Sequence, residues 1–348
     1  MSVNQLSAAG ARLPSAWSDA RRLLFCLLAL LASDGRAQDL MAYRSPQPTQ
    51  STVPAGTAAD TTGPLNPFRL QPGDHEFKLE SDRKYLLHIP AGYSPAKPAP
   101  LVLFFHGGGG HMEQAADAYG WREKSDKEGF IVAFPNGTSR FPRQHLATWN
   151  AGNCCGSARD KNVDDVGFVR QVIADIQRQV PIDRARIFAT GMSNGGMMSY
   201  RLACEAADII RAVAAVAGTD NTQTCKPSQP VSVLHIHARD DTHVLFDGGA
   251  GKDAFRDESK VTDFTSVNDT IRRWIALNHA AGTPRRVLDV PGAIGDLYTS
   301  KQNSARIQLV VTETGGHSWP GGKAVRRKKP STAINATDMI WDFFQSLQ

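Results

Sequence analysis

Cysteine and long hydrophobic runs are scarce in this sequence. Five of its 348 residues are cysteine, and the apolar run 23–32 is too short to cross a bilayer core. Charge of one sign is scarce too, since 39 Lys and Arg stand against 34 Asp and Glu. The hydrophobic fraction of 41% is ordinary for a globular protein. These values exclude a multispan membrane protein, a disordered chain and a collagen-like chain.

The net charge of +5 is concentrated locally. Five cations fall within 323–329: Lys323, Arg326, Arg327, Lys328 and Lys329. Outside this run and residues 1–37, acidic residues slightly outnumber basic ones. The run precedes Pro330 and contains no aromatic residue, so we expect a solvated loop and no nucleic-acid partner.

The amino terminus has the pattern of an export signal. Arg21 and Arg22 precede the apolar run, and Gly35 and Ala37 provide small residues at a cleavage site. We therefore expect a signal peptide over 1–37, a secreted or periplasmic protein, and no membrane attachment after cleavage. The bulky Phe25 before Cys26 disfavours a lipid anchor. Five prolines in 38–67 indicate a flexible linker, which leaves 68–348 as the folded domain.

Export places the remaining cysteines in an oxidising compartment. Cys204 and Cys225 enclose 20 residues, a loop that a disulfide closes usefully. Cys154 and Cys155 are adjacent, and they form either a vicinal disulfide or bonds elsewhere.

Short apolar runs alternate with amphipathic patterns along the domain. The predicted strands are Lys84–Ile89, Leu101–Phe105, Phe130–Phe134, Arg186–Thr190, Ala212–Ala217, Val231–His237 and Arg306–Thr312. The predicted helices are Glu113–Lys127, Asp165–Val180, Asn194–Ala206, Thr265–Ala281 and Asn335–Leu347. This alternation predicts an α/β fold with a mostly parallel sheet covered on both faces. Two long connections, 135–164 and 242–261, are expected to be functional.

A G-x-S-x-G motif lies between a strand and a helix at 191–195. This context is typical of a nucleophile elbow, which exposes the Ser193 hydroxyl at the end of the sheet. The Asn194 N–H then lies at a helix N-terminus, where it is suited to an oxyanion.

Four glycines, 107–110, follow His106 at the end of the strand Leu101–Phe105. Such a loop provides the second oxyanion N–H in α/β-hydrolases, and we assign that group to Gly108. The alternative is a phosphate-binding loop, but the Lys-Ser/Thr of that motif is missing. For His106 we expect a structural role.

A serine nucleophile requires a base and an orienting acid, in the chain order Ser, Asp, His for this fold. His317 lies in a glycine-flanked loop after the last predicted strand, where the base belongs. Asp240 and Asp241 both follow the strand Val231–His237, and their spacing favours Asp241 over Asp240.

His235, His237 and His243 near this aspartate pair also resemble metal ligands, because positions i and i+2 of a strand share a face. The binuclear metallohydrolase pattern H-x-H-x-D-H requires Asp and His where this sequence has Arg239 and Asp240. We therefore expect no catalytic metal and no cofactor.

Together these residues resemble the exported polyhydroxybutyrate depolymerase and feruloyl esterase-type family of α/β-hydrolases. The motifs are HGGGG (106–110), WNxGxCCG (149–156), VDDVGF (163–168), GMSNGGMM (191–198), HxHxxDD (235–241) and GGHSWPGG (315–322). The resemblance implies an extracellular carboxylic ester hydrolase with Ser193 as nucleophile, Asp241 as acid and His317 as base. The implied substrates are polyester oligomers, hydroxycinnamate esters of polysaccharide, or acetyl esters.

Two tryptophans within these motifs have two possible roles. Trp149 and Trp319 either line the substrate pocket or pack in the core. Because the sequence ends with the predicted helix Asn335–Leu347, we expect no added polymer-binding domain, which favours accessible esters over crystalline polymer. The alternative functions are a serine peptidase of the same fold and a non-catalytic envelope-binding protein.

Overall fold

The computed structural model describes residues 70–141, 146–254, 262–323 and 329–347. The chain divides into two units, and every described residue belongs to the second, Pro64–Gln348. The predicted signal peptide, the linker and the cations at 326–328 lie outside the described residues.

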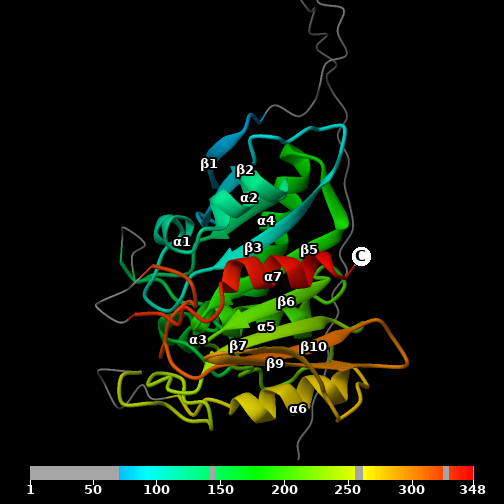
Figure 1. The fold of residues 1–348 in the computed structure, drawn as a ribbon. Helices are drawn as coiled ribbons and strands as arrows, with labels where there is room; N and C mark the ends of the chain where they lie inside the picture. The colour runs from blue at the N-terminus through cyan, green and yellow to red at the C-terminus, as the bar shows by residue number, and fades with distance from the viewer. Residues whose placement is uncertain (1–69, 142–145, 255–261, 324–328, 348) are drawn as a thin grey trace, which may run out of the picture. The chain divides into compact units, whose positions relative to one another are not determined.

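The described residues form one ten-stranded sheet in the order β1-β2-β4-β3-β5-β6-β7-β10-β9-β8 (Figure 1). The strands are β1 Gly73–Lys78, β2 Lys84–Ile89, β3 Ala99–Phe105, β4 Ile131–Pro135, β5 Ile182–Met192, β6 Ala212–Val216, β7 Ser232–Ala238, β8 Arg285–Val290, β9 Ala293–Thr299 and β10 Arg306–Thr312. The stretch from β4 to β10 is parallel throughout, and the two outer strands at each end of the sheet are antiparallel. The predicted mostly parallel sheet is confirmed.

Helices cover both faces of this sheet. They are α1 Met112–Ala118, α2 Trp121–Glu128, α3 Gly156–Asp160, α4 Asp165–Gln179, α5 Asn194–Glu205, α6 Val267–Leu277 and α7 Ala336–Gln345. One hydrophobic cluster joins the sheet to α4, α5 and α6, and a second joins it to α1, α2 and α7. Within the second cluster, Phe130 stacks on Trp341 of α7, with ring centroids 4.0 Å apart.

Burial on both faces explains the uninterrupted apolar runs in the sequence. Every residue of β3 and β7 is buried, so these strands need no polar alternation. The helix α4 buries only one stripe, and the Asp164 carboxylate caps it by accepting the Gly167 N–H at 2.7 Å.

Two sequence predictions need correction here. The helix predicted over Glu113–Lys127 is two helices, because Gly120 adopts a left-handed conformation (φ 71°) between α1 and α2. The sequence pattern does not predict the strands β1, β8 and β9, because none of them contains an apolar run. Exposure alternates along β1, and β8 is largely exposed.

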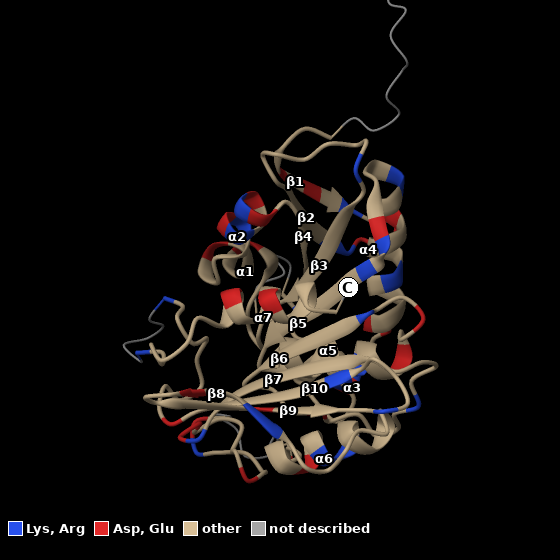
Figure 2. Ribbon diagram, turned by 45° about the vertical axis from the view of Figure 1, so that its right-hand side comes forward, with Lys and Arg blue, Asp and Glu red and all other residues tan. Residues whose placement is uncertain are grey.

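Charged residues of both signs share several of the described helices. Figure 2 shows Lys and Arg beside Asp and Glu along α2 and α4. At the edge of the cationic run, the Lys323 Nζ donates to the carbonyl of Asp117 at 3.0 Å. Among the described helices, none has the length and apolar character to cross a bilayer.

The predicted disulfide between Cys204 and Cys225 is confirmed, with an S–S distance of 1.97 Å. It joins the end of α5 to the loop after β6. Reducing it should lower the free energy of unfolding by about 3 kcal/mol, since the unfolded chain regains the freedom of this loop. Thermal melts with and without reductant, alongside a Cys204→Ser/Cys225→Ser variant, measure the effect. Equal melting temperatures in all three samples would contradict a stabilising bond.

Candidate active site

Ser193 lies at a tight turn between β5 and α5. Its φ of 56° and ψ of −123° are strained for a residue with a side chain, as a nucleophile elbow requires. The neighbouring glycines permit this turn, because a Cβ at Gly191 or Gly195 would collide with the carbonyl oxygen of Phe105. A hydrogen bond from the Ser193 N–H to the Val216 carbonyl, at 2.8 Å, ties the turn to β6. The side chain is half-buried.

The glycine loop after β3 lies against this turn. A Cβ on Gly107 would be 3.6 Å from that of Ser193, and a Cβ on Gly108 would be 3.6 Å from that of Asn194. The N–H groups of the next two glycines are used within the loop region, by the carbonyls of Ala147 (2.8 Å) and Gly107 (3.0 Å). The Gly108 and Asn194 backbones are therefore adjacent beside the serine, as an oxyanion hole requires.

His106 holds this loop and is neutral. Its Nε2 accepts the Gly137 N–H at 3.0 Å, so its Nδ1 carries the proton and donates to the Gly107 carbonyl at 2.8 Å. Burial lowers the pKa of His106 to about 4. The side chain therefore supports the glycine loop.

Asp241 and His317 are joined directly. The Nδ1 of His317 lies 2.8 Å from Oδ2 of Asp241, whose side chain is fully buried. The other carboxylate oxygen accepts the N–H groups of His243 and Val244, at 2.8 and 3.1 Å. Burial alone would raise the pKa of Asp241, but hydrogen bonds with His237 and His317 hold it well below its ordinary value. The carboxylate is thus ionised and fixed toward the His317 ring.

Asp240 has a different partner. It is exposed, and its Oδ1 accepts the N–H of Gly316 at 2.8 Å. It therefore contacts the backbone of the histidine loop, whereas Asp241 contacts the ring.

Ser193, Asp241 and His317 come after the strands β5, β7 and β10, in that order. Because these strands belong to the parallel part of the sheet, their carboxyl ends lie at one edge. Ligand sites of open α/β sheets lie at that edge. The structure therefore places Ser193 and the hydrogen-bonded Asp241–His317 pair at the same edge.

The tryptophan–cysteine loop is attached to the serine turn by Asn194. The Asn194 side chain accepts the Trp149 N–H at 2.8 Å and donates to the Trp149 carbonyl at 3.0 Å. The Trp149 indole in turn donates to the His106 carbonyl at 3.0 Å. One amide side chain therefore fixes the distance between two loops of the site.

Removing that side chain should destabilise the protein. In Asn194→Ala, the buried Trp149 N–H loses its partner, and the Trp149 carbonyl keeps only the Cys155 N–H, 3.0 Å away, which together costs about 2 kcal/mol in free energy of unfolding. Urea unfolding of the variant and the parent checks this. A loss below about 0.5 kcal/mol would show that water replaces both bonds.

The VDD motif supports the same loop from the other side. The buried Asp165 accepts the Asn150 N–H at 2.7 Å and pairs with Arg83 at 2.8 Å. The Arg83 guanidinium lies 3.8 Å from the ring centroid of Phe168. Burial raises the pKa of Asp165 despite this cation. Arg83 carried no signal in the sequence, whereas Asp165 lay in a recognised motif without an assigned role.

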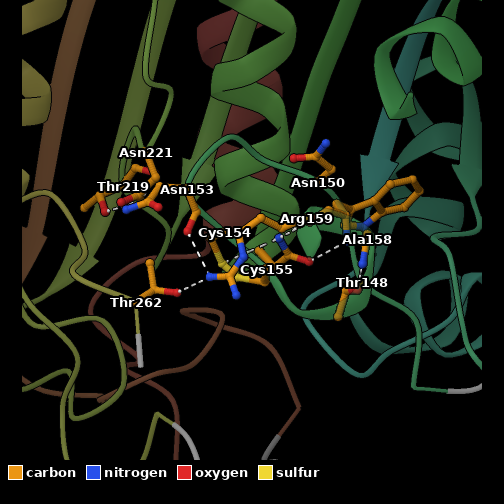
Figure 3. The surroundings of a disulfide bond; sticks show 12 residues. Thr148, Asn150, Asn153, Cys154, Cys155, Ala158, Arg159, Thr219, Asn221 and Thr262 are labelled. Atoms are coloured by element: carbon orange, nitrogen blue, oxygen red, sulfur yellow. Dashed lines mark hydrogen bonds between the residues drawn. A yellow bond between two sulfur atoms is a disulfide. The ribbon is translucent and has the colours of Figure 1, made fainter. Parts of the chain in front are cut away.

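The structure joins Cys154 to Cys155 as a vicinal disulfide, the first of the two open alternatives. Figure 3 shows Arg159 beside this pair, with its guanidinium directed at the Asn153 carbonyl and the Thr262 hydroxyl, each 3.4 Å away. The Asn153 N–H donates to the Asn221 carbonyl at 2.9 Å. These contacts attach the cysteine turn to the loop after β6, through Asn221, and to the segment before α6, through Thr262.

Both tryptophans pack in the core. Trp149 is fully buried against Phe105 and His106, with ring centroids 5.2 and 4.9 Å away. Trp319 is 4% exposed, and its indole donates to Thr337 at 3.0 Å. The structure thus favours core packing over the pocket role, and we assign neither ring to substrate.

His235 and His237 have protein partners at all four ring nitrogens. Their partners are Tyr200, each other, and the Val244 carbonyl, at 2.8, 3.2 and 2.9 Å. Both rings are therefore engaged in a hydrogen-bonded network within the protein. Sequence spacing does not predict that Tyr200, on α5, contacts His235.

Comparison with known proteins identifies a family and several relatives. The family "Esterase PHB depolymerase" matches residues 83–262. Feruloyl esterase B of Piromyces equi is 30% identical over 247 residues, covering 69% of this chain and 44% of that protein. Feruloyl esterase C of Emericella nidulans is 32% identical over 173 residues, covering 48% of this chain and 58% of its own length. The chain thus spans less than two thirds of either relative.

A solved structure shares the fold. The acetyl xylan esterase from Aspergillus awamori superposes with a TM-score of 0.51 at 13% identity, covering 78% of this chain and 99% of that one. This likeness confirms the α/β-hydrolase architecture alone. With the family match over half of its length, the chain belongs to the Esterase PHB depolymerase family.

Proposed function

We propose that this protein is an exported carboxylic ester hydrolase that works through an acyl-enzyme on Ser193. The observation that carries the proposal is the 2.8 Å bond between the His317 Nδ1 and the buried Asp241 carboxylate, at the edge where Ser193 occupies a strained turn. Family membership supports the same chemistry.

The direction of the Asp241–His317 bond determines the role of the imidazole. An ionised carboxylate only accepts, so the His317 Nδ1 donates and Nε2 of the neutral ring keeps its lone pair. In the proposed mechanism, Nε2 takes the Ser193 proton as the oxygen attacks the ester carbonyl. Asp241 then stabilises the imidazolium, and His317 returns the proton to the leaving alcohol. Water repeats the cycle on the acyl-enzyme.

The oxyanion forms beside two backbone N–H groups in this proposal. Asn194 is the first residue of α5, so its N–H is not used by the helix and lies at the positive end of the helix dipole. Gly108 provides the second group from the adjacent loop. Donors fixed before the reaction stabilise the developing charge without reorganisation.

For the substrate we propose hydroxycinnamoyl or acetyl esters of plant polysaccharide. Two relatives are named feruloyl esterases, and a third, from Neocallimastix patriciarum, is named a bifunctional acetylxylan esterase/xylanase and is 26% identical over 167 residues. Polyester oligomers are the alternative acyl donors suggested by the family description.

The test combines labelling and turnover. A fluorophosphonate probe should label the wild type and leave Ser193→Ala unlabelled. A panel of p-nitrophenyl acetate, methyl ferulate, acetylated xylan, polyhydroxybutyrate film and a peptide amide then ranks the substrates. Turnover of methyl ferulate or acetylated xylan above film and amide supports the proposal. Preferential amide cleavage would indicate a peptidase, and absent labelling would indicate a binding protein.

Export is proposed from the sequence pattern alone. Expression with the full amino terminus should release a processed protein that begins at Gln38. Amino-terminal sequencing of the extracytoplasmic fraction checks this, and an intact terminus in the cytoplasm would refute it.

A further inference from the structure

A line of buried polar side chains runs from the centre of α5 to the acid of the proposed triad. The Tyr200 hydroxyl lies 2.8 Å from the His235 Nδ1, and the His235 Nε2 lies 3.2 Å from the His237 Nδ1. The His237 Nε2 then lies 2.9 Å from the Val244 carbonyl and 3.4 Å from Oδ2 of Asp241. Each of these four side chains belongs to a residue that is at most 3% exposed.

One carbonyl determines the direction of every hydrogen bond in this line. The Val244 oxygen only accepts, so the His237 Nε2 carries a proton. In a neutral ring the His237 Nδ1 must then accept, which makes the His235 Nε2 a donor. The His235 Nδ1 consequently accepts from the Tyr200 hydroxyl. The neutral line therefore ends in one N–H, which is donated to the Val244 carbonyl and has Oδ2 of Asp241 as its second neighbour, 3.4 Å from the nitrogen.

The surroundings favour the neutral forms of His235 and Tyr200. Burial, followed by the nearby His237, lowers the pKa of His235 well below its ordinary value. Burial and the charge of Asp220 raise the pKa of Tyr200. Asp220 itself pairs with Arg273 at 3.4 Å and accepts from the Trp274 indole at 3.1 Å.

The end of the line near the triad has its own neighbours. Phe246 packs edge-on against the His237 ring, with centroids 6.1 Å apart, and Arg239 lies over the far side of that phenyl ring. The remaining charged or titratable groups there are Asp241 and, beyond it, His317 with His243 stacked on it at 4.5 Å. His237 is thus the side chain that contacts the same Asp241 oxygen as His317.

We propose that Tyr200, His235 and His237 form a relay of positioning residues that holds a second N–H, shared with the Val244 carbonyl, beside the Asp241 carboxylate. The relay fixes the His237 tautomer, and His237 fixes the oxygen that receives the His317 Nδ1–H. This inference rests on the proposed function, because it concerns the acid of that triad. None of the three residues touches substrate in this role.

The relay has a predictable effect on the pH dependence. A donor on the ionised form of Asp241 lowers the proton affinity of the coupled Asp241–His317 pair. Loss of the donor raises that affinity, so the base becomes available only at higher pH. The acidic limb of kcat/KM should therefore move upward by about half a pH unit or more when His237 loses its N–H.

The first experiment reads the tautomers without reference to activity. Imidazole ¹⁵N spectra of the wild-type protein, recorded at pH 8, should show the Nε2–H tautomer for both His235 and His237. In Tyr200→Phe the His235 Nδ1 resonance should shift, because it loses its donor. Tyr85→Phe is the matched control, since it removes a hydroxyl whose partner is Asp175 on α4. An Nδ1-protonated ring, or a His235 signal unmoved in Tyr200→Phe, would overturn the relay.

The second experiment compares His237→Leu with His237→Gln on a soluble ester. His237→Leu should lower kcat/KM about tenfold or more and shift the acidic limb upward. His237→Gln places an amide N–H where the Nε2–H was. The acidic limb of its pH profile should therefore lie closer to that of the wild type than the limb of His237→Leu does. A loss of activity with the limb unmoved in both folded variants would show a purely structural role and refute the proposal.

The outcomes separate the relay from the proposed function. If the wild type lacks Ser193-dependent hydrolysis, the function fails while the tautomer spectra still test the relay. If hydrolysis is present and the tautomers differ from those stated, the relay alone fails.

Discussion

Ser193→Ala should abolish ester turnover, with kcat/KM reduced at least about 10³-fold. The substitution removes one oxygen from a half-buried side chain at the turn between β5 and α5. The backbone strain at φ 56° is the same for serine and alanine, so the fold should persist. Steady-state kinetics on p-nitrophenyl acetate and a thermal melt measure the two properties separately.

Ser199→Ala provides a matched control on the same helix. The Ser199 hydroxyl is fully buried, lies six positions along the chain from the nucleophile, and donates to the Gly195 carbonyl at 3.1 Å. This variant should retain activity within about tenfold. If Ser193→Ala retained as much activity as Ser199→Ala, another residue would have to be the nucleophile.

Asp241→Asn should reduce turnover by up to about 10⁴-fold. The neutral amide presents an N–H to the His317 Nδ1, which lies 2.8 Å away in the parent. The imidazole then holds its proton on Nε2 and cannot accept one from Ser193. Kinetics at saturating substrate should show the loss in kcat, because binding groups are unchanged.

The neighbouring Asp240→Asn is the control for charge. Its amide oxygen can still accept the Gly316 N–H, and the side chain is exposed. The expected loss is therefore far smaller than at Asp241. A larger loss at Asp240 would move the acid by one position, and equal mild losses would place the acid on another strand end.

The central strands could be predicted from the sequence because burial on both faces restricts which residue types they can contain. Strands covered on both faces are mostly apolar, so β3 and β6 appear as uninterrupted apolar runs, and β7 is interrupted only by Ser232 and two buried histidines. The outer strands β1 and β8 are exposed on much of their surface, and this constraint is absent from them. Their pairing is decided by neighbours that are distant in sequence.

The residues of the candidate site also fall into two groups, those that the sequence could predict and those that it could not. Ser193, Asp241 and His317 each follow a predicted strand, so the order of the fold brings them to one edge. The supporting contacts do not follow from strand order. Tyr200 meets His235 across 35 positions, and Arg83 meets Asp165 across 82, through helix-on-sheet packing that no local pattern encodes.

Both ends of the sheet carry charge, and this affects how copies of the protein meet. At one end, β8 exposes Arg285 and Asp289, and Arg286 pairs with Asp296 of β9 at 2.8 Å. At the other end, Glu76 of β1 pairs with Lys84 of β2 at 2.6 Å. Charged side chains on an edge strand oppose its extension by a second molecule, because pairing would strip their water. The described ten-stranded sheet therefore ends at both sides in charged strands that disfavour edge-to-edge pairing with a second copy.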